Sequence, residues 1–486
     1  MSINKKLANL LATLPEGVKI DRSEQHEHAI ELFVSWEEPA SSDTECPYCS
    51  SAHVVKKDAG TFQTVRHLNA GFYGTFITFH KPRFRCKHCG HTFYMKPEWV
   101  HPYICITQAL LGDIYRKLTS TPHSIAEIAR ETNTSSSIVR SVMDSVDTST
   151  PLHLPETLGI DEFKGNSGYY DKASKKYIKE KYHCVITSAA SGHVIDILYK
   201  ANYSELMDYF SRFSLLERCK VRYFCTDMRN GFIKIGRQCF PNARICIDPF
   251  HVVQLITKAV STIRVDGWHR LRNAYNSAES EQNAAEKSGD KSKDSESDNK
   301  LKKLKEDLEL VKNSQKLLIT SPYNSSRYWS LNIEKREEKL AAVFALVPDL
   351  KPARDALMSF YDVAHIASHS ERHSALSSWI TKYISCELPP IRQAAYSIRK
   401  NRIEIENAWR YNQSNSPTEG LNKRIKDVKR LAFGLHDFET FRKRALLACG
   451  AISFNNPSYT IKDEKLYSKP VYSGSSKKNH KRRSSQ

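Results

Sequence analysis

The sequence predicts a multidomain α/β protein, in which small N-terminal modules precede a mixed-sheet domain that is interrupted by an all-α insertion. The chain has 486 residues, which is too long for one ordinary core and indicates roughly two to four domains. Two Cys-x-x-Cys pairs lie in the first hundred residues, and short apolar runs between 158 and 253 end in carboxylates, as buried strands often do. From about residue 253 to 400 the pattern is helical throughout.

The charge of the chain favours a polyanionic partner. Lys and Arg number 73 against 54 Asp and Glu, a formal net charge of +19, and nucleic acid is the commonest partner of such a protein. A merely basic protein is the alternative. No apolar run approaches the ~20 residues of a membrane span and the N-terminus lacks a signal-peptide core, so we expect no membrane partner. Four of the twelve cysteines are paired and eight are scattered, which fits a reducing compartment better than a disulfide framework.

The paired cysteines predict a structural zinc site in a β-ribbon. Residues 1–38 hold a short helical pattern from Lys5 to Leu14 and an apolar run at 30–36, and they reveal no function. Four thiolates in two tight turns suit tetrahedral zinc and leave no open position for a substrate. The four are Cys46, Cys49, Cys86 and Cys89. Free structural cysteines are the alternative, and His88 or His91 could substitute as a ligand, but four Cys is the simpler set. Residues 72–80 and 83–85 alternate like ribbon strands.

Residues 107–147 have a helical pattern that includes a candidate helix-turn-helix. Two short amphipathic segments, within 124–143, flank a polar turn. Ile125, Ile128 and Ala129 are expected to face Ile138 and Val142, which leaves residues 134–137 and Arg140 toward solvent. In a helix-turn-helix the second helix enters the DNA major groove. Any packed helical hairpin has a similar pattern, and the adjoining basic ribbon favours DNA binding.

Two apolar runs in the next region each deliver an aspartate. Asp161 follows Leu158-Gly-Ile160, and Asp227 follows residues 221–226, with a β-hairpin at 183–199 and a helical pattern near 203–216 between them. Two strands that bring carboxylates to one sheet edge predict a divalent-metal site, and Glu419 is the candidate third ligand. A further strand ends at Asp248, which either bonds His251 and supports the site or acts as an ordinary strand-end cap.

The helical stretch that follows contains a polar, low-complexity segment, 278–300, which predicts a disordered surface loop. After it, Ser416 and Pro417 mark a helix start. A face of that helix, by 3–4 spacing, would combine an acid with DNA-binding groups. Its members are Glu419, Asn422, Lys423, Lys426 and Arg430. Ser416-x-x-Glu419 is also a capping box, which is the non-catalytic alternative for Glu419. The tail, 457–486, is basic and serine-rich and predicts disorder with nonspecific electrostatic affinity.

These motifs together resemble bacterial insertion-sequence transposases of the zinc-ribbon ISL3 family. The resemblance runs from Cys46 to Phe438 and also includes the helical stretch from 317–324 to 348–350. Its motifs are the ribbon ending Phe84-Arg-Cys86, the helix-turn-helix, Gly159-Ile-Asp161-Glu162-Phe163, Thr226-Asp227-Met228, Asp248-x-x-His251-Val252, and Ser414-Asn-x-x-x-Glu419-Gly-x-Asn422-x-x-Ile425-Lys426. The segment 278–300 and the basic tail depart from the family pattern.

The resemblance implies a ribonuclease-H-like core with an Asp161, Asp227, Glu419 triad that holds two Mg²⁺ or Mn²⁺ ions. It implies phosphoryl transfer on double-stranded DNA, cleavage at element ends and strand transfer to target DNA. It further implies a homodimer that pairs two ends, and a cytoplasmic, nucleoid-associated bacterial protein. A DNA-binding regulator with an inactive core, or a nuclease that does not join strands, is the alternative function. The expected division is an N-terminal segment 1–38, zinc ribbon 39–100, helix-turn-helix 101–150, core 151–252 and 401–456, insertion 253–400 and tail 457–486.

Overall fold

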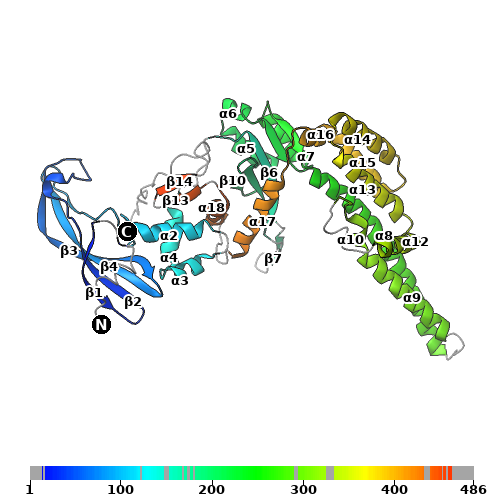
Figure 1. Ribbon diagram of the computed structural model, residues 1–486, viewed down its shortest axis with the longest axis horizontal. Helices are drawn as coiled ribbons and strands as arrows, with labels where there is room; N and C mark the ends of the chain where they lie inside the picture. Colours follow the sequence, from blue (N-terminus) through cyan, green and yellow to red (C-terminus); the bar gives the residue numbers. More distant parts are fainter. Residues whose placement is uncertain are drawn as a thin grey trace, which may run out of the picture. The chain divides into compact units, whose positions relative to one another are not determined.

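The computed structural model describes residues 14, 17–120, 123–146, 153–166, 169–171, 176–178, 181–288, 294–323, 333–431, 438–450, 452–455 and 458–461 (Figure 1). They form two compact units. Unit 1 comprises residues 1–154, 162–201 and 418–486, and unit 2 comprises residues 155–161 and 202–417. The predicted N-terminal helical pattern and most of the basic tail lie outside the described residues.

Unit 1 begins with a five-stranded sheet that contains the predicted ribbon. Its strands are β1 (Lys19–Gln25), β2 (Ala29–Ser35), β3 (Val54–Ala70), β4 (Tyr73–Cys86) and β5 (Thr92–Tyr94), in the order β1-β2-β4-β3 with β5 on β4. β3 and β4 form a long antiparallel hairpin, and β2 runs parallel to β4. The apolar run at 30–36 is therefore a strand whose buried face, including Leu32, packs on Ile77 and Phe79.

Three helices follow in unit 1: α2 (Gln108–Leu118), α3 (Ile125–Glu131) and α4 (Ser136–Asp144). A hydroxyl caps each N-terminus, and Ser124 with Glu127 forms a full capping box at α3. The buried faces are Ile125, Ile128 and Ala129 on α3 with Val139, Val142 and Met143 on α4. The expected contact face of α3 is confirmed. On α4, Val142 is buried as expected and Ile138 is partly buried against the same core, and Val139 and Met143 are buried in addition.

The second sheet contains the strands that carry the candidate carboxylates. Its strand order is β10-β9-β6-β11-β12. The bounds are β6 (Thr157–Asn166), β9 (Lys181–Ser188), β10 (His193–Leu198), β11 (Tyr223–Thr226) and β12 (Arg244–Ile247), and β7 (Tyr169–Asp171) pairs separately with β8 (Lys176–Ile178). β6, β11 and β12 are parallel. β9 and β10 form the predicted hairpin, whose four-residue turn ends at Gly192 with φ +67°.

Helices pack on this sheet within each unit. In unit 1, α17 (Ser416–Leu431) and α18 (Phe438–Cys449) bury Leu421, Ile425 and Phe441 against residues of β6, β9 and β10. A short hairpin of β13 (Ile452–Asn455) and β14 (Ser458–Ile461) follows. In unit 2, α5 (Tyr203–Ser211) and α6 (Leu215–Cys219) precede β11, and α7 (Asn230–Cys239) connects β11 to the parallel strand β12.

The predicted all-α insertion is helical over its described residues. It consists of α8 (Pro249–Ser288), α9 (Asp294–Asn313), α10 (Gln315–Ile319), α12 (Ile333–Leu346), α13 (Leu350–His365), α14 (His369–Ile384), α15 (Pro389–Lys400) and α16 (Arg402–Arg410). α8 and α9 run side by side (Figure 1). Among the described residues, no helix is both long and apolar enough to cross a membrane.

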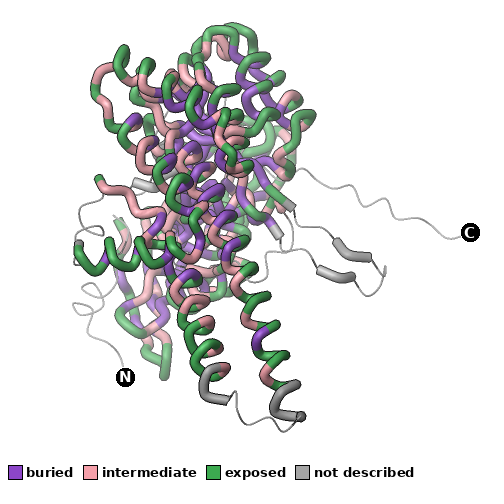
Figure 2. Tube along the Cα trace, turned by 90° about the vertical axis from the view of Figure 1, so that its right-hand side faces the viewer, coloured by how far each residue is buried: buried purple, intermediate pink, exposed green. Residues whose placement is uncertain are grey.

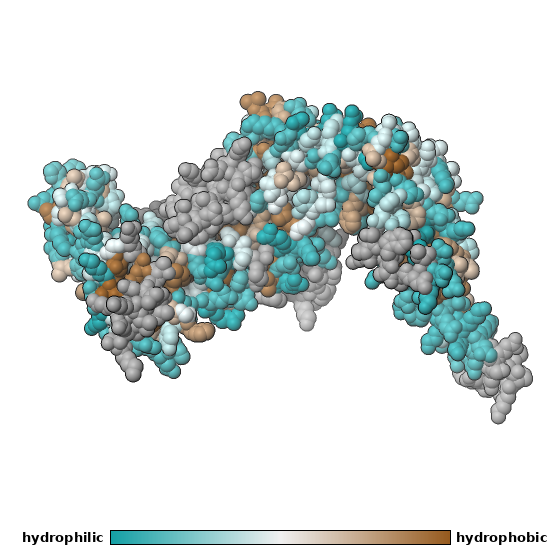
Figure 3. Space-filling view, viewed as in Figure 1, coloured by the Kyte–Doolittle hydropathy of each residue, from teal (hydrophilic) through white to brown (hydrophobic). Residues whose placement is uncertain are grey.

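The prediction of a disordered loop at 278–300 is wrong for residues 278–288 and 294–300, which belong to α8 and α9. The segment has no proline, and its four Glu, four Lys and three Ala are good helix formers, although Ser is its commonest residue and its mean hydropathy is low. Most described side chains in this part of the pair are exposed, and its surface is hydrophilic (Figures 2 and 3). A polar composition here reflects a solvated helix pair.

Candidate functional site

Asp161 and Asp227 are brought near each other by two adjacent parallel strands. Gly159 on β6 lies opposite Cys225 on β11, and Cys225 lies opposite Cys246 on β12. The residues two positions further along each segment are Asp161, Asp227 and Asp248. Asp161 is still within β6, whereas Asp227 and Asp248 come directly after β11 and β12, so this register brings the three residues near the carboxyl ends of the paired segments. Asp161 lies in the middle of β6, not at its end as the apolar run indicated, because β6 continues to Asn166.

Asp227 lies in an environment that disfavours its charge. Burial raises the pKa of its carboxyl group, and the charge of Asp161 raises that pKa further. The backbone N–H of Arg229 donates to Asp227 Oδ1 at 2.9 Å and opposes the rise, as does the charge of His251. Arg229 Nε is 3.3 Å from Asp227 Oδ2. Two half-buried carboxylates that repel each other are suited to binding a cation.

Asp248 connects β12 to the segment that precedes α17. Its carboxylate is buried, and Oδ1 accepts the N–H of Phe250 at 2.8 Å, which is the strand-end cap that the sequence allowed. Oδ2 accepts the hydroxyl of Ser414 at 2.8 Å and the N–H of Asn415 at 2.5 Å. Asp248 is therefore a positioning residue for the chain entering α17. The backbone N–H of His251 donates to the carbonyl of Asp248 at 3.1 Å.

Asn415 attaches the same segment to the strand that carries Asp161. Its side chain is fully buried, and Nδ2 donates to the carbonyl of Ile160 at 3.2 Å. Ser416 begins α17 as predicted, and its N–H donates to Ser414 Oγ at 3.0 Å. Glu419 follows in the first turn and is half-buried. In a capping box, the Glu419 carboxylate would accept the N–H of Ser416. In the structure the hydroxyl of Ser414 accepts that N–H.

The residues grouped on one face of α17 differ in their exposure. Lys423, Lys426 and Arg430 are exposed, and Arg430 Nη2 also contacts Asp427 at 2.6 Å. Asn422, which the 3–4 spacing grouped with these residues, is buried, with an exposure of 5%. Its position on the helix places it beside Leu421 and Ile425, which face the core of unit 1. Lys429 instead lies nearer the sheet, where Nζ donates to the carbonyl of Lys164 at 3.0 Å.

The four predicted zinc ligands come together in unit 1. The sulfur atoms of Cys46, Cys49, Cys86 and Cys89 all lie within 4.8 Å of one another. The Cys46–Cys89 and Cys49–Cys86 sulfur distances are 3.6 and 3.7 Å. Zn–S bonds of about 2.3 Å in a tetrahedron place sulfurs about 3.8 Å apart, so the set fits zinc closely. The ring of His91 stacks on Tyr48 with centroids 4.6 Å apart.

Both cysteine pairs lie in equivalent turns. The residue after each second cysteine is left-handed, Ser50 with φ 54° and Gly90 with φ 74°. This lets the N–H of Ser50 reach the carbonyl of Cys46, and the N–H of Gly90 reach that of Cys86. The backbone N–H of Cys89 donates to Cys86 Sγ and lowers the pKa of that thiol to about 6. A thiolate is thereby available as a metal ligand.

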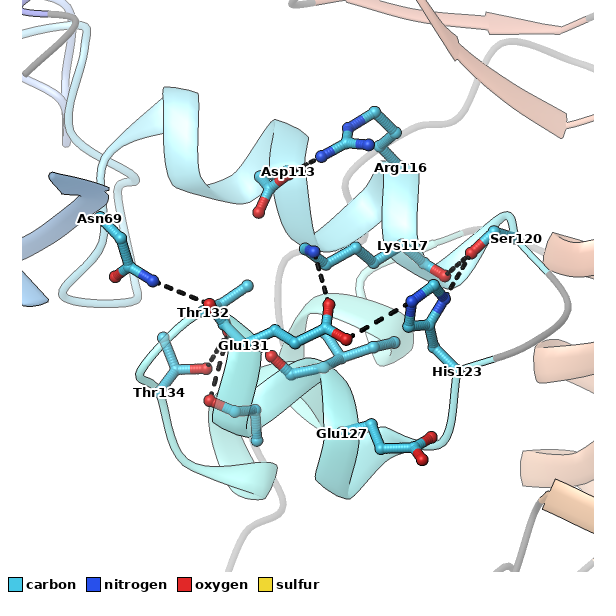
Figure 4. Close-up of polar contacts among 12 residues, drawn as sticks. Asn69, Asp113, Arg116, Lys117, Ser120, His123, Glu127, Glu131, Thr132 and Thr134 are labelled. Carbon is cyan, nitrogen blue, oxygen red and sulfur yellow. Dashed lines mark hydrogen bonds and ion pairs between the residues drawn. The ribbon is translucent and has the colours of Figure 1, made fainter. Parts of the chain in front are cut away.

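The turn between α3 and α4 is stabilised by polar contacts (Figure 4). Thr132 Oγ1 donates to the carbonyl of Ile128 at 2.6 Å, and its hydroxyl lies 2.8 Å from that of Thr134. Glu131 binds Lys117 Nζ at 2.6 Å, which lowers the pKa of the Glu131 carboxyl. At the start of α4, Ser135 to Ser137 and Arg140 are exposed as predicted, whereas Thr134 is half-buried.

Comparison with known proteins agrees with this geometry. Residues 42–89 match the model described as the zinc-finger of transposase IS204/IS1001/IS1096/IS1165. Residues 158–445, more than half of the chain, match the ISL3-type DDE transposase model, described as "Transposase". The chain belongs to the ISL3 family of transposases. The matched regions include the four cysteines, both aspartates and Glu419. The zinc-ribbon match and the clustered cysteines together support a structural zinc ion in this ISL3 transposase.

Two curated relatives are similar to this ISL3-family protein over a shorter stretch. Both are named "Transposase for insertion sequence element IS1557" and come from Mycobacterium tuberculosis strains CDC 1551 / Oshkosh and ATCC 25618 / H37Rv. Each is 23% identical over 276 residues, which are 55% of this chain and 56% of the relative. The chain thus spans about half the length of the curated relatives it matches.

Sequence reasoning missed several residues that position the candidate site of this ISL3-family protein. Ser414 and Asn415 were quoted within a motif, but no role was predicted for them, and Arg229 was not singled out. Asn415 could have been noticed because it immediately precedes the Ser416-Pro417 helix start, where a polar side chain often bonds to the backbone. Thr418, also unassigned, is fully buried and its hydroxyl lies 2.7 Å from that of Thr187 on β9.

Replacing one zinc ligand should release the metal. Cys86→Ser is expected to lower zinc content from about one ion per chain to near zero, because a serine hydroxyl is a poor ligand in a thiolate site. It should also weaken selective DNA binding and leave nonspecific affinity from the basic surface. Metal analysis and gel shifts on specific and random duplexes measure both effects. Cys105→Ser, an exposed cysteine outside the cluster, is the control. Full zinc occupancy in Cys86→Ser would contradict the ligand assignment.

Proposed function

We propose that this protein binds the ends of an insertion sequence and catalyses metal-dependent DNA cleavage and strand transfer. The observation that carries the proposal is the placement of Asp161 on β6 and of Asp227 directly after the adjacent parallel strand β11, with the raised pKa of Asp227. Holding two mutually repelling, half-buried carboxylates together is costly unless a cation or proton offsets their charge. A site that keeps them together is therefore more consistent with a reaction centre than with a structural role.

The strand order supports a ribonuclease-H-like core. Three parallel strands, β6, β11 and β12, are continued on one side by the antiparallel hairpin of β9 and β10. The first strand of the chain in this sheet, β6, occupies the middle position. Residues at the centre of such a sheet are held rigidly by neighbours on both sides, which suits Asp161 as the ligand shared by two ions.

The proposed cofactors are two Mg²⁺ or Mn²⁺ ions held by Asp161, Asp227 and Glu419. Carboxylate oxygens are the hard ligands that these ions prefer. When bound, the ions would supply charge neutralisation at the scissile phosphate and activation of the attacking hydroxyl. Glu419 is the third proposed ligand because Asn415, four residues earlier, is bonded to the carbonyl next to Asp161. Asp248 positions that segment through Ser414 and Asn415.

The exposed cations are proposed to bind the DNA backbone. On α17, Lys423, Lys426 and Arg430 lie on the exposed face one to three turns beyond Glu419. In unit 1, α3 and α4 are proposed to act as a helix-turn-helix, in which exposed Ser135 to Ser137 and Arg140 face the major groove. Asn422 is not included, because its side chain is buried. A homodimer is proposed because two element ends must be joined in one complex, and cytoplasmic, nucleoid association follows from the DNA substrate.

An end-cleavage assay tests the proposal. The terminal inverted repeat is first identified in the DNA that flanks the coding frame. A duplex that carries this repeat is then incubated with the protein, Mg²⁺ and a supercoiled target plasmid. Cleavage at the repeat followed by joined products is the expected result. Selective binding without cleavage would instead indicate a regulator with an inactive core. Cleavage without joining, also from pre-cut ends, would indicate a nuclease. Absence of selective binding and cleavage would overturn the proposal.

A further inference from the structure

Phe72 is a fully exposed aromatic residue at a rigid turn. Its exposure is 100%. Ala70 pairs with Tyr73 across the β3–β4 hairpin, so Gly71 and Phe72 alone form the loop. Gly71 has φ +63°, and a glycine with positive φ at the first central position is typical of the tight II′ turns that match strand twist. The aromatic ring therefore projects from a short, well-defined tip.

A buried arginine fixes the end of this hairpin. Arg66 is only 6% exposed, and Nη2 donates to Asn69 Oδ1 at 3.0 Å. Its guanidinium also lies over the ring of Phe76, 4.5 Å from the centroid. Gly74 leaves the necessary space, because a Cβ at that position would lie 2.4 Å from the guanidinium nitrogens. The residues on both sides of the Phe72 turn are thus held in one arrangement.

Asn69 then links the hairpin to the turn between α3 and α4. Its Nδ2 donates to the carbonyl of Glu131 at 2.7 Å, and Asn133 Nδ2 donates to Asn69 Oδ1 at 3.4 Å. Figure 4 shows Asn69 pointing toward this turn from the neighbouring strand. All these residues belong to unit 1. The hairpin end that carries Phe72 is therefore attached through Asn69 to the helix pair proposed to contact DNA.

We propose that Phe72 inserts between base pairs of the DNA next to the segment contacted by α4, and so contributes to end recognition by unstacking one base step. The inference rests on the proposed DNA binding by α3 and α4. Apolar side chains that enter the minor groove act as such wedges and kink the duplex. Insertion would remove the exposed ring from water and stack it against the bases. A hairpin end that is fixed in one arrangement can hold the ring in that position.

The charge of the hairpin favours DNA over a protein partner. Residues 54–86 contain six Lys or Arg and one Asp, which suits a phosphate backbone. A single projecting ring beside Gly71 offers far less than the roughly 800 Å² per partner of a stable protein interface. Phe62, on the same ribbon and 70% exposed, lies ten residues from the tip in sequence and provides a matched control.

The test uses the full chain and the terminal-repeat duplex, with 2-aminopurine placed at successive base steps. The fluorescence of 2-aminopurine increases when the base is unstacked. Wild type should increase the emission at one step. Phe72→Ala should lose this signal and bind the repeat about tenfold more weakly, with an unchanged melting temperature, since the ring contacts no core residue. Phe62→Ala should behave as wild type, and Phe72→Trp should retain the signal.

Other outcomes decide against the inference. Wild-type affinity and emission in Phe72→Ala, with selective binding by wild type intact, would overturn the insertion alone. A change in oligomeric mass by light scattering in Phe72→Ala, with the 2-aminopurine signal preserved, would assign Phe72 to a protein interface and also overturn it. Selective binding by wild type is measured before any variant is compared. Its absence would overturn the proposed function.

Arg140→Ala should weaken repeat binding, and the complex that still forms should keep the 2-aminopurine emission.

Discussion

Asp227→Asn should abolish DNA cleavage and leave the protein folded and able to bind DNA. An amide has the shape of the carboxyl group but is a poor ligand for Mg²⁺. Metal ions contribute several kcal/mol to phosphoryl transfer, so cleavage should fall roughly a hundredfold or more. Asp161→Ala should have the same effect. Cleavage rates and gel shifts on terminal-repeat duplexes measure the two properties separately. A variant that cleaves at the wild-type rate in Mg²⁺ would not have lost a ligand.

The raised pKa of Asp227 gives the same substitution a second, non-catalytic readout. A carboxyl group with a higher pKa in the folded than in the unfolded protein binds its proton more tightly when folded. It costs no stability below its unfolded pKa, near 4, and destabilises the fold as the pH rises through the folded pKa. At pH 7 without metal, Asp227→Asn should therefore melt at or above the wild-type temperature. The difference should vanish toward pH 4.

Divalent ions should reverse that order. Mn²⁺ should raise the melting temperature of wild type, because a ligand that binds only the folded state stabilises it, and should have little effect on Asp227→Asn. Asp208→Asn, an exposed aspartate on α5 in the same unit, should retain both the Mn²⁺ response and cleavage. An equal Mn²⁺ shift in wild type and Asp227→Asn would contradict a metal site at Asp227.

The elements that carry the site were predictable because their signals are local. A buried parallel strand is a continuous apolar run, so residues 158–160 and 221–226 indicated β6 and β11. The cysteine spacing likewise indicated the sulfur cluster, since two tight turns can provide four thiolates only in a few arrangements. The hairpin at 183–199 followed from two apolar runs separated by a turn that ends in glycine. Each of these predictions is confirmed.

Features that depend on distant contacts were not predictable from spacing. The bond from Asn415 to the carbonyl of Ile160 joins residues 255 positions apart, and no local pattern specifies it. The burial of Asn422 depends on which side of α17 meets β6, β9 and β10, whereas the 3–4 spacing identified only a shared face. The α8–α9 pair was misjudged because polarity indicates exposure and does not distinguish a solvated helix from a disordered chain.

Glu419→Gln separates a catalytic role from a helix cap. The two interpretations differ because Gln caps a helix nearly as well as Glu but binds Mg²⁺ poorly. The Ser416 N–H already donates to Ser414 Oγ at 3.0 Å, so losing the carboxylate should cost the start of α17 little. We expect a melting temperature within about a degree of wild type, since a full cap contributes only ~1 kcal/mol, and loss of cleavage in Mg²⁺.

Two companion variants make the Glu419 test decisive. Glu419→Ala should also fold and should be as inactive as Glu419→Gln, because both remove the charged ligand. Ser414→Ala should be the less stable protein, since it removes the acceptor of Ser416 N–H and a donor to buried Asp248. If Glu419 were only a cap, Gln would preserve cleavage and Ala would lose stability and activity in parallel. Wild-type-like cleavage by Glu419→Gln would leave Asp161 and Asp227 without their third partner and require another residue to complete the metal site.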